Sequence, residues 1–433
     1  MTERTRITEE RGNAPPHAAA GVRRRARVAV VCDLREENWP SMNLVADMLL
    51  DGLRRDFAAE FEAVRVCPPM RRRFSRAGES RGRRFNLDRL LNRFGDYPRA
   101  LRRLRDEFDI FHVVDHSYAQ LLHELPAGRS VVTCHDLDTF RCLIDPAVEP
   151  RPAPFRLMTR RVLGGFRRAA RVACDSRATR DELLAQEWFA PARVRVVRLG
   201  VHPAYSHEPD SAAAGEAARL LGPADGGAPE LLHVGSTIAR KRIDVLLEVF
   251  AAVRREFPRA RLVRAGGPLT PAQVAQAARA GVGDAIVTLP FVGESALAAI
   301  YRRAALTLLP SEREGFGLPL VESLRCGTPV VASDLPVLRE LGGEGGGGAA
   351  VVYRAAGDAA AWSAAIVELL RERDAAPARW GQRRAAAVAL AAPFTWRGCV
   401  EEAAALYREV LAEREARENF GPARGAVPGG GPA

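Results

Sequence analysis

The feature that most constrains the fold of this chain is the stretch Glu314-Gly-Phe-Gly-Leu-Pro-Leu-Val-Glu322. It follows an apolar run, residues 304–310, that is typical of a buried strand, and it leads into apolar residues with helical spacing. The stretch is therefore predicted to be a glycine-containing turn between a strand and a helix. Backbone N–H groups at such a turn, with the positive end of the helix dipole, favour an anion such as a diphosphate. A carboxylate on that helix, Glu322, could hold the paired hydroxyls of a ribose.

Apolar runs and helical patterns alternate along most of the chain, which predicts an α/β fold with two doubly wound domains. We expect a Rossmann-like domain at 27–205, a linker at 206–229, a second Rossmann-like domain at 230–392 and a final helix at 393–418. The polar ends, residues 1–26 and 419–433, are expected to be disordered because they contain too few apolar residues to fold.

Polar residues follow two of the predicted strands in the first half of the chain. His116 ends one strand, and His135 and Asp136 end the next. Because the carboxyl ends of parallel strands face the ligand crevice, we expect these side chains to point into it. Histidines at strand ends also serve purely structural roles, and position alone does not separate the two interpretations. Trp39 lies in the turn after the first strand, where it would either line an acceptor site or have only a packing role.

The run from Glu314 to Asp334 resembles the Glu-x7-Glu signature of the family 4 retaining glycosyltransferases, which have the two-domain GT-B fold with a central cleft. The resemblance extends over roughly residues 110–410. It implies a cytoplasmic enzyme that takes its sugar from a UDP-, GDP- or ADP-sugar, needs no cofactor or metal, and uses a glycan or lipid-linked acceptor. In many such enzymes the last helix crosses back to the first domain, and the final helix predicted here could do so.

The resemblance also implies roles for individual residues. Lys241 and Arg240 would neutralise the leaving diphosphate, Glu314 would hold sugar hydroxyls and Glu322 the ribose. His135 and Asp136 would lie beside the reacting sugar. By their positions after strands, Trp39 and His116 are expected on the acceptor side. The remaining donor-binding positions are expected to be Gly235, Ser236, Phe291, Val292, Gly315, Phe316, Gly317 and Leu318.

The turn after the first strand, residues 36–42, departs from the family because it has no glycine. A backbone cradle for phosphate at that turn is therefore in doubt. This departure is the main argument for a competing hypothesis, a nucleotide-binding or scaffold protein of the same fold that has lost turnover.

All of the net charge lies in the first part of the chain. Residues 1–200 contain 38 Arg against 27 Asp and Glu, a net charge of +11, whereas residues 201–433 are neutral. Seven arginines and one glutamate fall between Arg71 and Arg84. Such a run is usually a solvated loop, and it could also contact an anionic surface, either a membrane or a phosphorylated acceptor. No nucleic-acid-binding motif accompanies it. With no apolar segment of membrane-spanning length, we expect a cytoplasmic protein, peripheral on the inner face of the plasma membrane if the arginines bind lipid.

Overall fold

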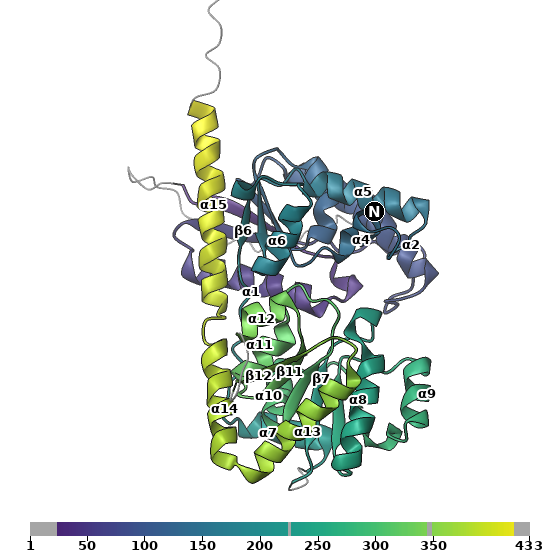
Figure 1. The fold of residues 1–433 in the computed structure, drawn as a ribbon. Helices are drawn as coiled ribbons and strands as arrows, with labels where there is room; N and C mark the ends of the chain where they lie inside the picture. Colours follow the sequence, from purple (N-terminus) through teal and green to yellow (C-terminus); the bar gives the residue numbers. More distant parts are fainter. Residues whose placement is uncertain (1–23, 224–226, 344–348, 420–433) are drawn as a thin grey trace, which may run out of the picture. The chain divides into compact units, whose positions relative to one another are not determined.

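The computed structural model describes residues 24–223, 227–343 and 349–419. The described chain forms two parallel six-stranded sheets with helices packed around them, an α/β architecture (Figure 1). The predicted tails lie largely outside the described residues. Arg24, however, is placed by an ion pair with Asp109, and the last helix ends at Asn419.

Two compact units make up the fold. The first comprises Met1–Ala173, Gln186–Arg195 and Val400–Ala433, and the second comprises Cys174–Ala185 and Val196–Cys399. The domain limits expected from the sequence remain predictions, and part of the predicted linker, Ser211–Leu221, is helix α7.

The first sheet has the strand order β2-β1-β3-β4-β5-β6. Its strands are β1 (Ala26–Val31), β2 (Phe61–Val66), β3 (Ile110–Val113), β4 (Ser130–Cys134), β5 (Arg171–Cys174) and β6 (Val194–Val196). The helices connecting them are α1 (Pro40–Asp56), α2 (Arg83–Leu91), α3 (Tyr97–Leu104), α4 (Arg141–Ile144), α5 (Ala153–Phe166) and α6 (Arg177–Ala185). Strand β1 lies between β2 and β3, and its residues Val28–Val31 are almost completely buried because both faces of a parallel sheet are covered.

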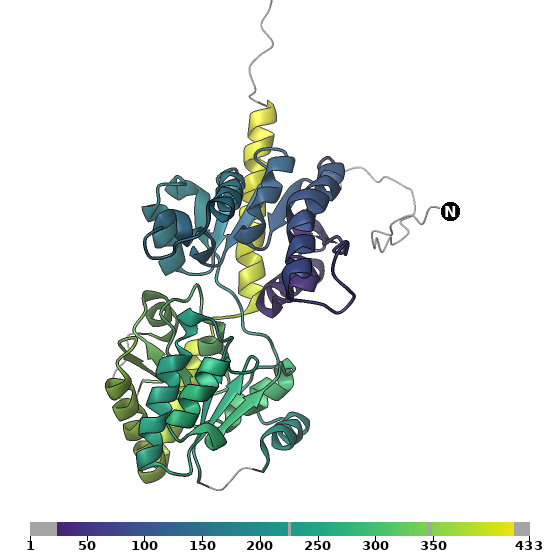
Figure 2. The ribbon, with the colours of Figure 1, turned by 90° about the vertical axis from the view of Figure 1, so that its right-hand side faces the viewer.

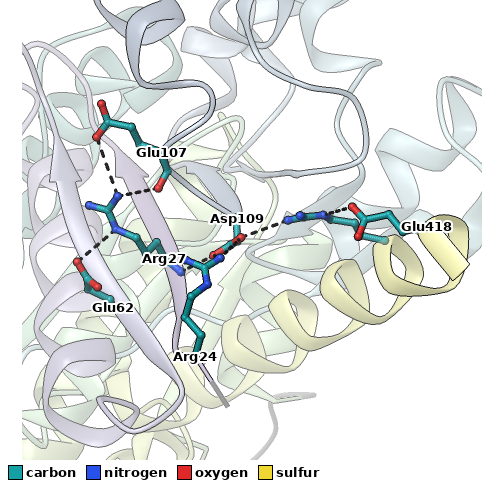
Figure 3. Close-up of polar contacts among 7 residues, drawn as sticks. Arg24, Arg27, Glu62, Glu107, Asp109 and Glu418 are labelled. Carbon is teal, nitrogen blue, oxygen red and sulfur yellow. Dashed lines mark hydrogen bonds and ion pairs between the residues drawn. The ribbon is translucent and has the colours of Figure 1, made fainter. Parts of the chain in front are cut away.

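The last helix, α15 (Trp396–Asn419), contributes its residues from Val400 onward to the first unit, as expected for the family (Figure 1). The Tyr407 hydroxyl lies 2.6 Å from Nδ1 of His112 on β3, and Tyr407 also packs edge-to-face on Phe61 of β2. Near the start of β1, the Asp109 carboxylate accepts hydrogen bonds from Arg24, from the Arg27 N–H and from Arg414 of α15 (Figure 3). The final helix is therefore part of the first unit's packed structure.

The second sheet has the strand order β12-β11-β10-β7-β8-β9. Its strands are β7 (Glu230–Val234), β8 (Arg261–Ala265), β9 (Ile286–Leu289), β10 (Leu306–Leu309), β11 (Val330–Ser333) and β12 (Val351–Arg354). Its helices are α7 (Ser211–Leu221), α8 (Ile243–Glu256), α9 (Pro271–Arg279), α10 (Glu294–Arg303), α11 (Leu318–Arg325), α12 (Pro336–Gly342), α13 (Ala359–Ala375) and α14 (Pro377–Ala391), and they surround the strands (Figure 2). One core layer joins Leu231 and Leu262 of the sheet to Phe250 of α8 and Trp362 of α13.

Candidate functional site

The predicted strand–turn–helix around Glu314 is present, from β10 to α11. Gly317 is the N-cap of α11 and has a left-handed φ of 102°. A Cβ at this position would lie 2.8 Å from Leu338 Cδ2, so both the backbone angle and the available space require glycine. Because α11 begins only at Leu318, Glu322 lies in its second turn.

Glu314 is the centre of a hydrogen-bonded network in this turn. Its carboxylate accepts hydrogen bonds from Lys241 Nζ at 2.5 Å and Ser311 Oγ at 2.7 Å, and Arg240 Nη1 lies 3.4 Å away. Burial alone would raise the pKa of Glu314, but the charges of Lys241 and Arg240 bring it below its usual value. Glu314 is therefore an ionised carboxylate at neutral pH.

The two cations come from the turn after β7, which is adjacent to β10 in the sheet. Lys241 and Arg240 lie in a short 3₁₀ turn, Ala239–Lys241, that precedes α8. The N–H of Glu312 donates to the Arg240 carbonyl at 2.8 Å, and Arg240 Nη1 donates to the Arg313 carbonyl at 2.7 Å. The structure thus brings together Lys241 and Glu314, which are distant in sequence, as the sequence hypothesis required.

Gly235 and Ser236 begin the same turn. Gly235 has a φ of 152°, and a Cβ there would lie 3.7 Å from the Lys241 side chain. Ser236 is exposed. The aliphatic stem of Lys241 therefore runs beside the glycine backbone.

Glu322 has a different environment from Glu314. The Tyr301 hydroxyl donates to Glu322 Oε2 at 2.9 Å, and no cation is among its hydrogen-bond partners in the described chain. Burial raises the pKa of Glu322 to about 7, against the lowering effect of the Tyr301 hydrogen bond and with a small contribution from Glu294. Tyr301 was missed by the sequence analysis because it lies within an ordinary amphipathic helix, α10.

The segment expected to face the nucleobase follows β9. Phe291 is 66% exposed and Val292 is half-buried. An exposed phenylalanine offers an apolar face on which a base could stack.

In the first unit, the polar residues at the strand ends do come together. His116 lies between two carboxylates, with Nδ1 3.4 Å from Asp115 and Nε2 3.9 Å from Asp136. The ring of His135 lies 6.4 Å from that of His116, and its Nε2 pairs with the Val114 carbonyl at 2.8 Å. His116, His135 and Asp136 thus form one cluster at the carboxyl ends of β3 and β4.

Two further carboxylates, missed from the sequence, belong to the same edge of the sheet. Asp33 follows β1 and Asp115 follows β3, and both side chains are buried. Neither oxygen of Asp33 has a hydrogen-bond partner among the described residues. Burial and the nearby Asp115 raise the pKa of Asp33 well above its usual value. Asp115 is also buried, but His116, His135 and Ser117 lower its pKa. Their position at strand ends, the signal that indicated His116, could have found both.

The glycine-free turn after β1 is held by side chains. Glu37 accepts hydrogen bonds from the Tyr118 hydroxyl at 2.7 Å and from Trp39 Nε1 at 3.2 Å, and Asn38 takes the left-handed conformation with a φ of 55°. Trp39 remains 52% exposed. The turn therefore holds its shape without glycine and presents an indole to solvent.

The arginine-rich segment is anchored, although such runs are usually solvated loops. The buried Asp88 carboxylate of α2 accepts hydrogen bonds from the backbone N–H groups of residues 73–75 and from the Ser75 hydroxyl. Burial alone would raise the pKa of Asp88, but these hydrogen bonds lower it below its usual value. Apolar side chains accompany the exposed arginines: Phe74, Leu87 and Leu91 are 48%, 44% and 41% exposed.

No helix in the described ranges combines the length and apolarity needed to cross a membrane. Within the same residues, no three His, Cys, Asp or Glu side chains are arranged to hold a metal ion. The residues around Glu314 belong to the second unit, and the cluster around His116 belongs to the first.

Solved structures first show the fold. The sucrose-phosphate synthase of Thermosynechococcus elongatus matches with a TM-score of 0.65 at 21% identity, covering 90% of this chain and 100% of that one. The HepE protein of Anabaena, solved in complex with UDP and glucose, matches with a TM-score of 0.65 at 15% identity, covering 89% and 100%. Both likenesses support the GT-B fold of the glycosyltransferases.

Sequence comparison then gives the family. The model "Glycosyltransferase Family 4" matches residues 45–205, and the model "Glycosyl transferases group 1" matches residues 222–386. The chain belongs to glycosyltransferase family 4. The D-inositol 3-phosphate glycosyltransferase of Thermobispora bispora is 36% identical over 254 residues, and that of Acidothermus cellulolyticus is 34% identical over 264 residues. The aligned part covers 56% of the length of each of these relatives.

Proposed function

We propose that this protein is a retaining glycosyltransferase that moves a sugar from a nucleotide-sugar donor to an acceptor hydroxyl. The observation that carries the proposal is the Lys241–Glu314 network, in which an ionised carboxylate is held at 2.5 Å from an ammonium beside a glycine turn. A carboxylate for sugar hydroxyls and cations for a leaving diphosphate are the two things such a reaction needs. Membership of family 4 supports the same assignment.

The chemistry requires little covalent help from the protein. The C–O bond between the sugar and the diphosphate breaks through an oxocarbenium-like state, and the acceptor oxygen forms the new C–O bond on the same face of the sugar while its proton passes to an oxygen of the departing diphosphate. Catalysis then consists of holding the reactants and stabilising the negative charge that develops on the diphosphate. Lys241, Arg240 and the N–H groups of Gly315–Leu318 would supply that stabilisation.

The other residues take supporting roles in this proposal. Glu322 holds the ribose, Phe291 and Val292 pack on the base, and Gly235 and Ser236 border the diphosphate. On the acceptor side, His135 and Asp136 contact the reacting sugar, and His116 and Trp39 line the acceptor. The side-chain anchoring of the turn after β1 supports an intact acceptor side, and so weakens the argument for an inactive protein.

A UDP-sugar is the first donor to test, because HepE of Anabaena was solved with UDP and glucose. For the acceptor we propose a glycan or a lipid-linked sugar, in cell-envelope, exopolysaccharide or glycolipid synthesis at the cytoplasmic face of the membrane. The relatives' name adds D-inositol 3-phosphate as a soluble candidate. The net charge of +11 in residues 1–200 supports an anionic acceptor or surface.

The proposal is tested in two stages. A thermal-shift screen of UDP-, GDP- and ADP-sugars finds the donor, because a ligand that binds only the folded state raises the melting temperature. Transfer to the acceptors is then assayed, with product anomers identified by NMR and Glu314→Gln as the control for the site. The product is expected to keep the anomeric configuration of the donor sugar. Donor binding without transfer or hydrolysis would support the competing hypothesis of a scaffold protein, and an inverted product would contradict the retaining mechanism.

A further inference from the structure

Arg264 is a charged residue in the middle of a buried strand. It lies on β8, next to β7, and its side chain is 0% exposed. The alternation of side chains along a strand places it on the same face as Leu262, which belongs to the core layer of the second unit. An arginine at this position is buried as deeply as the apolar residues around it.

The guanidinium group has very few partners. Its Nη2 donates to the Gly235 carbonyl at 2.8 Å, while Nε and Nη1 have no hydrogen-bond partner, and the described residues provide no ion pair. Burial lowers the pKa of Arg264, yet arginine keeps its proton in proteins. A buried charge without a counter-charge is costly, which makes the site attractive to an anion.

Two other basic residues, His233 and Lys241, lie beside the same glycine. His233 on β7 is the register partner of Arg264, and a Cβ on Gly235 would lie 3.4 Å from the His233 ring. Burial, and then the charges of Arg264 and Lys241, lower the pKa of His233 well below its usual value, so its ring is neutral. The cluster therefore contains the charges of Arg264, Lys241 and Arg240, with the Glu314 carboxylate bonded to the latter two.

The space around the Gly235 carbonyl is closely filled. A Cβ on Gly266 would lie 2.3 Å from that oxygen, and Arg264 donates to the same oxygen. The carbonyl is thus fixed from both β8 and the turn that follows β8. Since the Gly235 turn leads to Lys241, whatever fixes this carbonyl also fixes the start of that turn.

We propose that Arg264 is a positioning residue of the donor site, which holds the Gly235 turn through its carbonyl and places a buried positive charge behind the donor diphosphate. The inference rests on the proposed function, because it assumes that the diphosphate binds beside Lys241. Arg264 acts on the diphosphate in two ways: it holds the Gly235 turn in place, and its positive charge attracts the diphosphate at a distance. The diphosphate then serves as the counter-charge that Arg264 lacks.

The test measures binding of UDP, UMP and uridine by calorimetry at low salt, with GDP and ADP included in case the base differs. Arg264→Met replaces the charge by an apolar side chain of similar length, and Arg264→Lys retains the charge. Arg261→Met is the matched control, because Arg261 is on the same strand but is ion-paired with Glu230.

For Arg264→Met we expect affinity for UDP to fall by about 10-fold or more, affinity for UMP to fall less, and affinity for uridine to be unchanged, since the loss should follow ligand charge. Its melting temperature without ligand should be equal to or above that of wild type, because an unpaired buried charge has been removed. Arg264→Lys should recover part of the UDP affinity. Arg261→Met should melt earlier and bind UDP normally.

Equal UDP affinity in Arg264→Met and wild type would overturn the inference, as would an equal loss of affinity for uridine. If Arg264→Met does not fold, UDP affinity in Arg264→Lys decides: a loss confined to the phosphorylated ligands supports the positioning role, and unchanged affinity overturns it. Wild-type protein that binds no nucleoside diphosphate at all would instead overturn the proposed function.

Discussion

Lys241 is the only lysine among the 64 basic residues of the chain, in a composition that otherwise uses arginine. Its side chain is 11% exposed and its ammonium lies 2.5 Å from Glu314. An ammonium is a compact point charge, whereas a guanidinium is a wide planar fork, so arginine should not fit between the carboxylate and a diphosphate. We therefore interpret this lysine as a geometric requirement of the site.

The expected consequence is that Lys241→Arg loses turnover although it keeps the charge. We expect transfer to slow by more than ~10-fold, or about 1.4 kcal/mol of transition-state stabilisation, with little change in melting temperature. Arg242→Lys is the control, because Arg242 pairs with Asp244 and Glu312 and has no role in the proposed site. Normal rates in Lys241→Arg would show that charge alone suffices there.

Glu322 should make the stability of the protein depend on pH. Its pKa is about 7 in the folded protein, against an ordinary glutamate value of 4.5, so between these values the unfolded chain has released the proton while the folded protein keeps it. Stability should therefore fall as pH rises from 4.5 to 7 and be level above 7. Glu322→Gln should remove this fall and be more stable than wild type at pH 8, by up to roughly 3 kcal/mol. The measurement is the free energy of unfolding of both proteins, obtained with denaturant at pH 4.5, 6 and 8.

The same substitution separates a ribose-binding role from a structural one. An ionised carboxylate accepts stronger hydrogen bonds from hydroxyls, so Glu322→Gln should bind UDP more weakly, by about 1.5–3 kcal/mol at pH 8. The difference between the two proteins should shrink at pH 6, where Glu322 is protonated. An unchanged UDP affinity at pH 8 would rule out the ribose assignment.

At the scale of helices, two glycines with opposite environments give a matched pair. In α1, a Cβ on Gly52 would lie 2.5 Å from Cγ2 of Val400 on α15, and valine cannot turn aside because its χ1 is restricted. In α7, Gly215 is exposed, and a Cβ there meets no atom within 4 Å. One substitution should therefore have opposite effects at the two positions.

We expect Gly52→Ala to destabilise the protein by about 1–3 kcal/mol through overpacking. Gly215→Ala should stabilise it by roughly 0.5–1 kcal/mol, because alanine restricts the unfolded chain and favours helix. Urea unfolding measures both effects, provided that the m-value is the same in the variants and in wild type. A stable Gly52→Ala variant would mean that α15 does not pack on α1 as described.

The elements that could be predicted from sequence are those with a clear apolar pattern, such as the strand expected at 304–310, which is β10 (Leu306–Leu309), and the final helix expected at 393–418, which is α15 (Trp396–Asn419). Helix α7 was missed because proline, glycine and aspartate cluster around it, and these residues are typical of linkers. Helix α2 was missed because the apolar side chains Leu87 and Leu91 are exposed, so its pattern is not that of a core-facing helix.

A local motif, the family resemblance and positions at strand ends each indicated part of the candidate site. The motif indicated Glu314 and Glu322, and the family resemblance indicated Lys241. Arg264 could not be found in this way, because it lies in an apolar strand and its relation to His233 and Gly235 depends on the register of the sheet. Tyr301 and Ser311 likewise become partners of the two glutamates only in the folded chain.

At the scale of the whole molecule, charge separates the first part of the chain from the second. Arg76, Arg83 and Arg84 are exposed beside the apolar side chains of Phe74 and Leu87. Arginines around exposed apolar residues are typical of a surface that contacts an anionic membrane. We expect the triple variant R76S/R83S/R84S to sediment less with anionic liposomes, each charge contributing about 1 kcal/mol.

A triple variant with the same change in net charge, R219S/R255S/R279S in the second unit, is the control and should sediment like wild type. If wild-type protein does not sediment with anionic liposomes at low salt, the membrane hypothesis is wrong. The triple variant R76S/R83S/R84S could instead show a higher KM for a phosphorylated acceptor and sediment with liposomes like wild type. That result would assign the surface to acceptor binding.

Helix α15 has a consequence for how the protein is made. Chains leave the ribosome amino end first, and domains generally fold in that order. The first unit cannot complete its packing in that order, because Tyr407, the partner of the buried His112, and Arg414, a partner of Asp109, lie in α15, which follows the second unit in sequence. All residues of the second unit, up to Cys399, are synthesised before these partners. The unit that begins synthesis first is therefore the one that completes its folding last.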